Sequence, residues 1–539
     1  MLTQITQQIP AACISDKDQC GRRLRGLPRC METATIGRPN RRLRDTSLGL
    51  KCLQPFLASA ALMICAVASA VAADAPAVST STTNRTAQAD TSSGLDRAPA
   101  WGLPLQKPAW LTDLSVGVRQ SYDDNVFLAG ADSKYLPPAY TVPPGSAVAL
   151  RDISSWVTTV SPKVAVNLAP LLGAQNLESL SFSYAPDFAE YYDTPSEDNS
   201  AHRFGTAIKA RAESFSLAVE NNFTCVDGDS IAPTYPGALL SAIGIAAPRE
   251  RREQIQDHAT VALRYDGDSW FIRPTASLLY YDMMTELIDV PGYQDYCDRC
   301  DVNGGADFGY KLSPQTAVTL GYRYRYQYQE QFSFSPYSSP SDYQRLLVGF
   351  EGKPWKWLEV KFLAGPDFRD YPGDTPTHST PVADKTPVKY YGEASVTAKL
   401  SSKDALTFRS KQFQWVSSLG KVPYYDSLFD LAYRRAVTTR LNVDLGGRVW
   451  SADYNSGDLP TCTRDDWQYS VLAGVTYTFS THLSANLAYE LDLGRNGQDD
   501  IANPQAREYN RNLVSLNVLL KLWTAREAKR LPPWNASRK

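Results

Sequence analysis

Histidines, cysteines and clustered acids are the residues of this chain whose types and spacing could do chemistry. The four histidines are His202, His258, His378 and His482. A hydrolase needs a defined set of nucleophile, base and orienting acid, and none of the four histidines stands in a recognisable local motif of that kind. The sequence therefore predicts that the protein is not an enzyme.

The cysteines offer one local motif, Cys297-Asp298-Arg299-Cys300. A zinc site would need a second pair of ligands nearby, and a redox motif would sit on a βαβ unit. The surrounding sequence shows neither pattern. In an exported protein a small loop disulfide is the simpler reading. We therefore expect a Cys297–Cys300 disulfide, no metal and no cofactor.

A third group is Asp123-Asp124-Asn125. Side chains of this type bond to their own backbone and favour turns at strand ends. Calcium also takes such oxygen ligands, but the spacing names no further ligands. We interpret the group as a turn.

The ionised residues carry more information, because they alternate with apolar ones. The stretch from Lys311 to Tyr328 reads KLSPQTAVTLGYRYRYQY. Successive side chains of a strand point to opposite faces. One face holds Val318, Leu320, Tyr322, Tyr324, Tyr326 and Tyr328, and the other holds Thr319, Gly321, Arg323, Arg325, Gln327 and Gln329. A soluble sandwich would bury the apolar face, whereas a membrane barrel would turn it to lipid.

Similar alternation predicts 18 strands, an even number that is usual for bacterial membrane barrels. We expect strands at 112–120, 153–168, 178–192, 201–213, 215–225, 254–266, 269–282, 301–312, 316–329, 342–352, 356–370, 387–400, 404–416, 422–437, 440–452, 466–479, 482–494 and 507–523.

The connections between these strands alternate in length. Every second one is a tight turn, such as Asp266-Gly267-Asp268-Ser269 and Ser401-Ser402-Lys403. The intervening connections are mostly long and polar, although 193–200 and 417–421 are short. Short turns at one end and long loops at the other are typical of outer-membrane barrels. We predict an all-β fold, a single transmembrane antiparallel β-barrel with short periplasmic turns and long extracellular loops.

In such a barrel the charged faces must line the interior, since a charge facing lipid near the midplane costs about 2–4 kcal/mol. About 18 strands enclose a lumen too wide for side chains to fill. Any one basic residue there could simply pair with an acid, whereas an excess of unpaired arginine on one wall would favour anionic solutes. The pore-lining candidates are Arg203, Lys209, Arg211, Arg323, Arg325, Arg345, Arg440, Asp444, Arg448, Glu490 and Asp492.

The N-terminus resembles a targeting segment. Basic residues precede the apolar run Phe56 to Ala68, and small residues follow up to Ala73. This run is short for a membrane-spanning helix, which needs about 20 residues, and fits a cleaved signal peptide. We expect a leader at 1–73, a disordered periplasmic lead-in at 74–110, the barrel at 111–523 and a basic tail at 524–539.

The chain without its leader has 45 basic and 53 acidic residues. A nucleic-acid binder would show a basic excess, so we expect none. The expected partners are outer-membrane lipid, the barrel-assembly machinery and a transported solute. The sequence does not give the oligomeric state.

Two stretches carry a resemblance to a known family. They are Ser115 to Leu128, SVGVRQSYDDNVFL, and Tyr509 to Leu516, YNRNLVSL. Gly117, Tyr122, Asp123, Asp124, Asn125, Val126 and Phe127 make the first stretch similar to the start of the beta-barrel porin type 2 family of Gram-negative outer-membrane proteins. The resemblance implies an outer-membrane barrel, with some members linked to exopolysaccharide systems, and no catalytic residues. The basic tail ending at Lys539 departs from the aromatic end of many such barrels.

These observations leave several functions open. The first is a channel for diffusion of small polar solutes. The alternatives are an exporter of an anionic exopolysaccharide, whose basic residues would form a continuous track, and a non-conducting structural barrel. A plugged receptor would need a plug domain and about 22 strands, which 74–110 and the strand count do not supply. A soluble secreted adhesin or lectin would bury the apolar faces instead.

Overall fold

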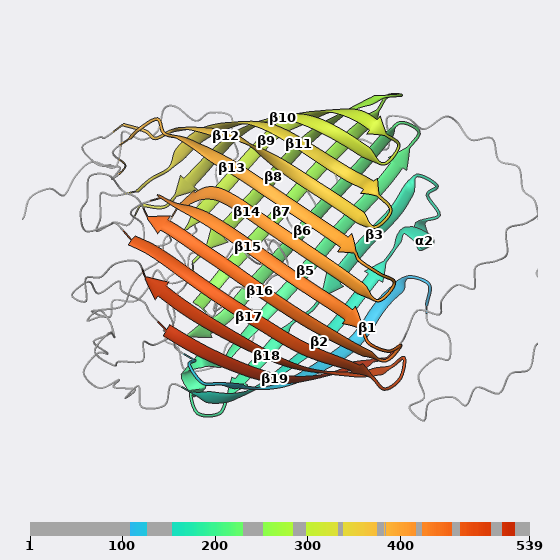
Figure 1. Cartoon of the computed structure of the whole chain (residues 1–539), viewed down its shortest axis with the longest axis vertical. Helices are drawn as coiled ribbons and strands as arrows, with labels where there is room; N and C mark the ends of the chain where they lie inside the picture. The colour runs from blue at the N-terminus through green and yellow to red at the C-terminus, as the bar shows by residue number, and fades with distance from the viewer. Residues whose placement is uncertain are drawn as a thin grey trace, which may run out of the picture. The chain divides into compact units, whose positions relative to one another are not determined.

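The computed structural model describes residues 108–126, 154–229, 252–283, 298–331, 338–373, 382, 384–416, 423–454, 464–496 and 509–522. Every strand in these ranges belongs to one antiparallel sheet (Figure 1). The strands are β1 (Leu111–Asp123), β2 (Ser155–Asn167), β3 (Leu177–Tyr184), β4 (Asp187–Tyr191), β5 (Asn199–Ala212), β6 (Phe215–Asp229), β7 (Arg252–Asp266), β8 (Trp270–Asp282), β9 (Arg299–Ser313), β10 (Thr316–Gln329), β11 (Ser341–Trp355), β12 (Leu358–Asp370), β13 (Val388–Lys399), β14 (Asp404–Val416), β15 (Pro423–Ala436), β16 (Leu441–Tyr454), β17 (Arg464–Thr478), β18 (Leu483–Asn496) and β19 (Tyr509–Lys521).

The sheet closes on itself. β1 pairs with β2 on one side and with β19 on the other, from Ser115 opposite Lys521 to Asp123 opposite Leu513. β3 and β4 each pair with both β2 and β5, so together they occupy one position. The result is a closed antiparallel barrel of 18 strand positions, which confirms the predicted fold class. Closure leaves no edge strand, as a bilayer requires.

The connections confirm the predicted alternation. The tight turns gather at one end of the barrel, on the right in Figure 1, together with the short helix α2 (Ala169–Leu172). At the opposite end, where the 3₁₀ turn η3 (Pro195–Glu197) lies, consecutive strands are mostly separated by longer stretches of sequence. Gly352 lies near the end of β11, opposite Thr316 at the start of β10 and next to a register shift. It has φ +132°, and a Cβ there would lie 1.9 Å from the Gln315 carbonyl oxygen. Only glycine fits this close approach.

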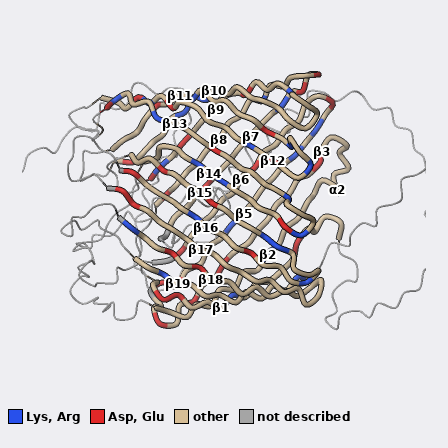
Figure 2. Tube along the Cα trace, in the orientation of Figure 1, with Lys and Arg blue, Asp and Glu red and all other residues tan. Residues whose placement is uncertain are grey.

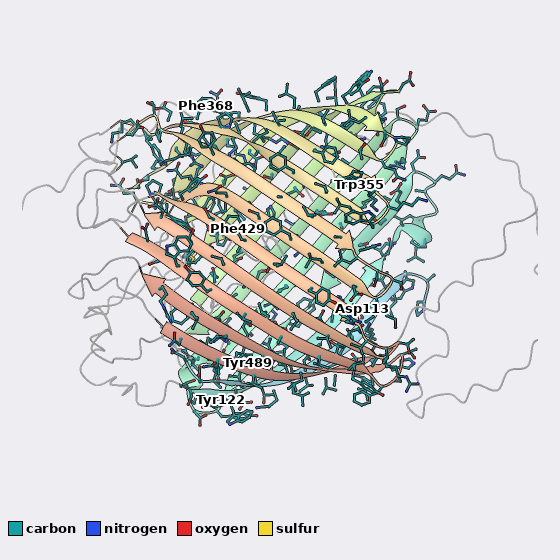
Figure 3. All side chains as sticks on the ribbon, in the orientation of Figure 1. Asp113, Tyr122, Trp355, Phe368, Phe429 and Tyr489 are labelled. Carbon is teal, nitrogen blue, oxygen red and sulfur yellow. The ribbon has the colours of Figure 1, made fainter. Side chains whose placement is uncertain are left out.

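The two faces of the wall also agree with the prediction. Along β10, the outward side chains from Val318 to Tyr328 are 38–60% exposed, whereas Arg323 is 7% exposed. Figure 3 shows large side chains such as Phe368, Phe429 and Trp355 on the outside of the strands. Hydrogen-bonded polar pairs also occur on this outer face, for example where Asn221 donates to Asp257 at 2.5 Å. The mutual hydrogen bond offsets part of the cost of removing both groups from water.

Several predictions need correction or stay open. The strand predicted at 178–192 is broken into β3 and β4, and Arg440 lies in the exposed turn before β16 rather than in a strand. Within the described ranges no helix has the length and apolarity to cross a membrane. The leader at 1–73, almost all of the lead-in at 74–110 and the tail at 524–539 lie outside the described residues and stay predictions.

Candidate pore-lining site

The ionised side chains converge on the concave side of the barrel. Arg273 on β8 reaches Glu351 on β11 at 2.9 Å, and the rings of Tyr281 on β8 and Trp415 on β14 lie 6.4 Å apart. These contacts skip two and five intervening strands. Side chains can meet over such spans only inside a curved wall, because they diverge on its convex side. The charged face therefore looks into the lumen.

Arg323 and Arg448, whose direction shows which face of the wall points inward, both lie on this inner face. Arg323 pairs with Asp307 at 2.7 Å, and Asp307 also binds Arg273. Arg448 stands opposite Asp430 and Ser470 in the register, and Ser470 stands opposite Asp492. Cross-strand partners share a face, so these residues form one inward row.

The remaining candidates are mostly paired with acids. Arg325 binds Asp301 at 3.4 Å and Arg345 binds Asp367 at 2.7 Å. The other inward pairs are Arg203 with Asp187, Arg211 with Glu178, and Asp444 with Arg434. Asp492 is fully buried and accepts from Ser470 and Arg511, Glu490 lies beside it on β18, and Lys209 is exposed on β5. Figure 2 shows both signs of charge distributed along the strands.

Sequence reasoning missed several inward cations, among them Arg273, Arg299, Arg369 and Lys411. Each lies on a predicted strand, or two residues before one, in register with a charged face that had been identified. The strand alternation alone could have found them. Their partners could not all be found that way, because some lie on distant strands. Arg299 on β9, for example, donates to the Val416 carbonyl on β14.

An aromatic cluster occupies part of the inner wall. It contains Tyr281, Leu347, Tyr391, Phe413, Trp415, Tyr424, Leu428, Trp450, Ala452 and Tyr509, all buried. Arginines stack on these rings: the Arg345 guanidinium lies 4.2 Å from the Tyr391 ring centroid, and Arg299 lies 4.9 Å from that of Tyr281. Trp450 donates its Nε1 proton to Asp426 at 2.6 Å. We call this set the inner aromatic cluster, and its members come from strands between β8 and β16 and from β19.

The wall from β2 to β6 is more open. Its inward cations Lys163, Arg203 and Arg211 have side chains 47%, 49% and 66% exposed. A hollow of about 680 Å³ opens at the end with the tight turns. It is lined by Arg211, Glu213, Ser214, Phe215, Ser216, Arg264, Asp266, Asp268, Ser269, Lys311, Ser313 and Pro314. The lumen is therefore asymmetric, packed on one side and wet on the other.

The two stretches that carry the family resemblance meet at the seam between β1 and β19. Arg511 donates to both oxygens of Asp123 at 3.1 and 2.9 Å and to Asp492 at 3.1 Å. Asn512 donates its backbone and side-chain nitrogens to Asp124, both at 2.6 Å. Asn125 donates to the Asn510 carbonyl at 2.9 Å. The expected Asx turn is thus a clasp that ties the first strand to the last, and we call it the seam clasp.

The three histidines in the described part of the chain lie apart from one another and do not form a hydrolytic set. His202 Nε2 lies 3.3 Å from Ser200 Oγ and its Nδ1 lies 2.9 Å from Tyr184 Oη, on the outward face. His482 Nδ1 contacts the Lys521 carbonyl at 2.9 Å in a turn, and His258 faces the lumen. His378 lies outside the described residues. Across the ranges that the structure describes, no three His, Cys, Asp or Glu side chains are grouped to hold a metal ion.

The predicted Cys297–Cys300 disulfide stays a prediction, because Cys297 lies outside the described residues. Cys300 is buried in β9, and Cys225 on β6 is disulfide-bonded.

No family model and no curated protein matches the chain. The resemblance to the porin type 2 family therefore stays a prediction, whereas the expected outer-membrane barrel architecture is confirmed. Among similar solved structures are Pseudomonas aeruginosa OpdK with vanillate (12% identity, 76% of this chain and 98% of that chain, TM-score 0.38) and Pseudomonas aeruginosa OccK2 (OpdF) in complex with glucuronate (10%, 76% and 98%, 0.37). The ferric citrate transporter FecA in its unliganded form is also similar (10% identity, 77% of this chain and 79% of that chain, TM-score 0.35).

Proposed function

We propose that this protein is an outer-membrane channel for the passive diffusion of small polar solutes. The observation that carries the proposal is that the same barrel has an apolar outer face and solvent-exposed charges on its inner face. Arg211, for example, is 66% exposed although it faces inward. An exposed charge inside a closed barrel requires water there, because an isolated charge in a dry interior is far too costly.

The asymmetry of the lumen supports a selective rather than a wide, general pore. The inner aromatic cluster and the arginines stacked on it narrow one side. Solutes would pass between this packed wall and the open wall of β2 to β6. Polar groups fixed by ion pairs cost little further ordering when a solute binds, which favours recognition.

The test is planar-bilayer recording on refolded protein. A conducting channel is expected to insert in discrete steps of current. A well-folded barrel that inserts without conducting would overturn the proposal and leave a closed exporter or a structural barrel.

An exporter of an anionic polysaccharide is less well supported. Such a protein needs a continuous track of available cations, whereas Arg203, Arg323 and Arg345 are each held by an aspartate. We also propose no enzymatic role, since His202 is held by hydroxyl groups and hydrogen-bonds no carboxylate within the described part of the chain.

A further inference from the structure

One group of basic side chains on the inner wall between β9 and β14 has fewer acidic partners than members. Five basic side chains of these strands lie against aromatic rings: Arg299, Arg325, Arg345, Arg369 and Lys411. We call this set the basic wall. Asp301 pairs with Arg325 alone, but Asp367 serves both Arg345 at 2.7 Å and Arg369 at 3.2 Å. Five cations against these two carboxylates leave a surplus of three, or two if Asp426 is also counted.

Arg299 is one of the surplus cations. It is 3% exposed, and no carboxylate of the described residues lies within ion-pair distance. Its Nη1 donates to the Val416 carbonyl at 3.3 Å, and its Nε has no hydrogen-bond partner in the described part of the chain. Its guanidinium lies 4.9 Å from the Tyr281 ring centroid and 5.8 Å from that of Trp415. Cation–π contacts of this kind contribute only about 0.5–2 kcal/mol each.

Lys411 is the second. Its Nζ lies 4.9 Å from the Phe413 ring centroid, and no ion pair joins it to the described acids. Glu393 stands opposite in the register, but its carboxylate is bound by Lys361 at 3.3 Å and by the Tyr391 hydroxyl at 2.8 Å. Asp426 likewise holds Trp450. Lys411 is only partly buried, so it remains within reach of the lumen.

The two surplus cations are joined by aromatic rings. Tyr281 and Trp415 lie 6.4 Å apart and Trp415 and Phe413 lie 6.3 Å apart, both edge to face. Arg299 therefore lies at one end of a ring-to-ring strip and Lys411 at the other. Both surplus charges therefore lie along one aromatic strip of the inner wall.

We propose that the basic wall is a binding site for small organic carboxylates, with Lys411 as the cation that contacts the ligand. A cation without a partner in a partly dry wall is costly unless an anion comes to it. A carboxylate from the lumen would supply the negative charge that Lys411 lacks. Arg299 and the group in which Arg345 and Arg369 share Asp367 would add further positive charge around the ligand. This site deepens the proposed channel function and rests on it.

The experiment measures channel current across a bilayer in a potassium chloride gradient, and then its block by sodium benzoate. Benzamide, which has the same ring and no charge, is the matched neutral probe. We expect the wild-type channel to prefer chloride over potassium and to be blocked by benzoate at concentrations at which benzamide has no effect.

The variants separate the site from the overall charge of the lumen. Lys411→Gln is expected to weaken benzoate block by about tenfold or more, since a hydrogen bond to a charged group contributes about 1.5–3 kcal/mol. Lys209→Gln removes the same charge from the exposed face of β5 and should leave the block unchanged. Lys411→Arg keeps the positive charge, so benzoate should block this variant about as strongly as it blocks the wild-type channel. Heat-modifiable migration on gels shows that each variant is folded.

The outcomes distinguish the two proposals. A wild-type protein that never conducts refutes the channel itself. A conducting wild-type channel that benzoate and benzamide block equally, or a Lys411→Gln channel that loses no more block than Lys209→Gln, refutes the carboxylate site and leaves the channel standing.

Discussion

The substitution Arg511→Gln should destabilise the barrel strongly, because it opens the seam clasp at its centre. The Arg511 side chain is 12% exposed, and its partners Asp123 and Asp492 are 3% and 0% exposed. Glutamine cannot replace three charged hydrogen bonds, so two buried carboxylates lose their cation. Removing one partner of a buried ion pair typically costs about 3–5 kcal/mol.

Other contacts limit the loss. Asp123 keeps the backbone donor of Asn125 at 3.1 Å, and Asp492 keeps the Ser470 hydroxyl at 2.5 Å. We therefore expect the free energy of unfolding to fall by about 3–5 kcal/mol and no further. The matched control is Arg434→Gln, which breaks the pair with Asp444 at 2.6 Å where the arginine is 71% exposed. An exposed pair of this kind contributes only about 0–1 kcal/mol.

The assay is guanidinium unfolding of the refolded barrel in lipid vesicles, followed by tryptophan fluorescence. The double variant Asp123→Asn with Arg511→Gln should lose less than the sum of the two single variants, because they share one interaction. Equal losses for Arg511→Gln and Arg434→Gln would refute the view that the clasp holds the seam.

Three further predictions test other parts of the structure. Leu431 points outward and is 47% exposed, while its neighbour Ala432 points inward. Leu431→Arg should therefore lower the free energy of unfolding by about 2–4 kcal/mol, and Ala432→Arg by much less. Equal effects of the two variants on unfolding in vesicles would contradict the assignment of faces. A Cβ at Gly365 would lie 1.8 Å from the Leu346 carbonyl oxygen, so Gly365→Ala should cost about 1–3 kcal/mol, whereas Gly392→Ala, with open space around it, is the control. Cys225 should resist alkylation in the denatured protein until a reductant is added, which mass spectrometry of the Cys225 peptide would show.

The barrel itself could be predicted because strand alternation is a local signal. In β10 every second residue is apolar, and the 18 predicted strands all fall on observed ones, with ends that differ by up to four residues. The orientation of Arg323 and Arg448 followed from the same alternation. A lipid environment enforces it over every strand, since a one-residue slip would turn each charge outward.

The site could be predicted only in part, because its decisive contacts join distant strands. No local pattern shows that Arg299 on β9 meets Trp415 on β14, or that one carboxylate, Asp367, serves two arginines. The curvature of the wall brings these groups together, and curvature follows from strand number and stagger. The seam clasp was missed for the same reason: the residues Asp123 and Arg511 had been identified, but not as partners.

The seam clasp also bears on how the chain reaches its final form. Asp123 and Arg511 are 388 positions apart in the sequence. Contacts of such high contact order form slowly, because the whole intervening chain must be arranged first. A ribosome delivers Arg511 long after Asp123, so until then β1 remains an open edge that could pair wrongly. We therefore expect an assembly factor to escort and insert this chain. A chain truncated before Tyr509 would lack β19, the strand that pairs with β1 to close the barrel.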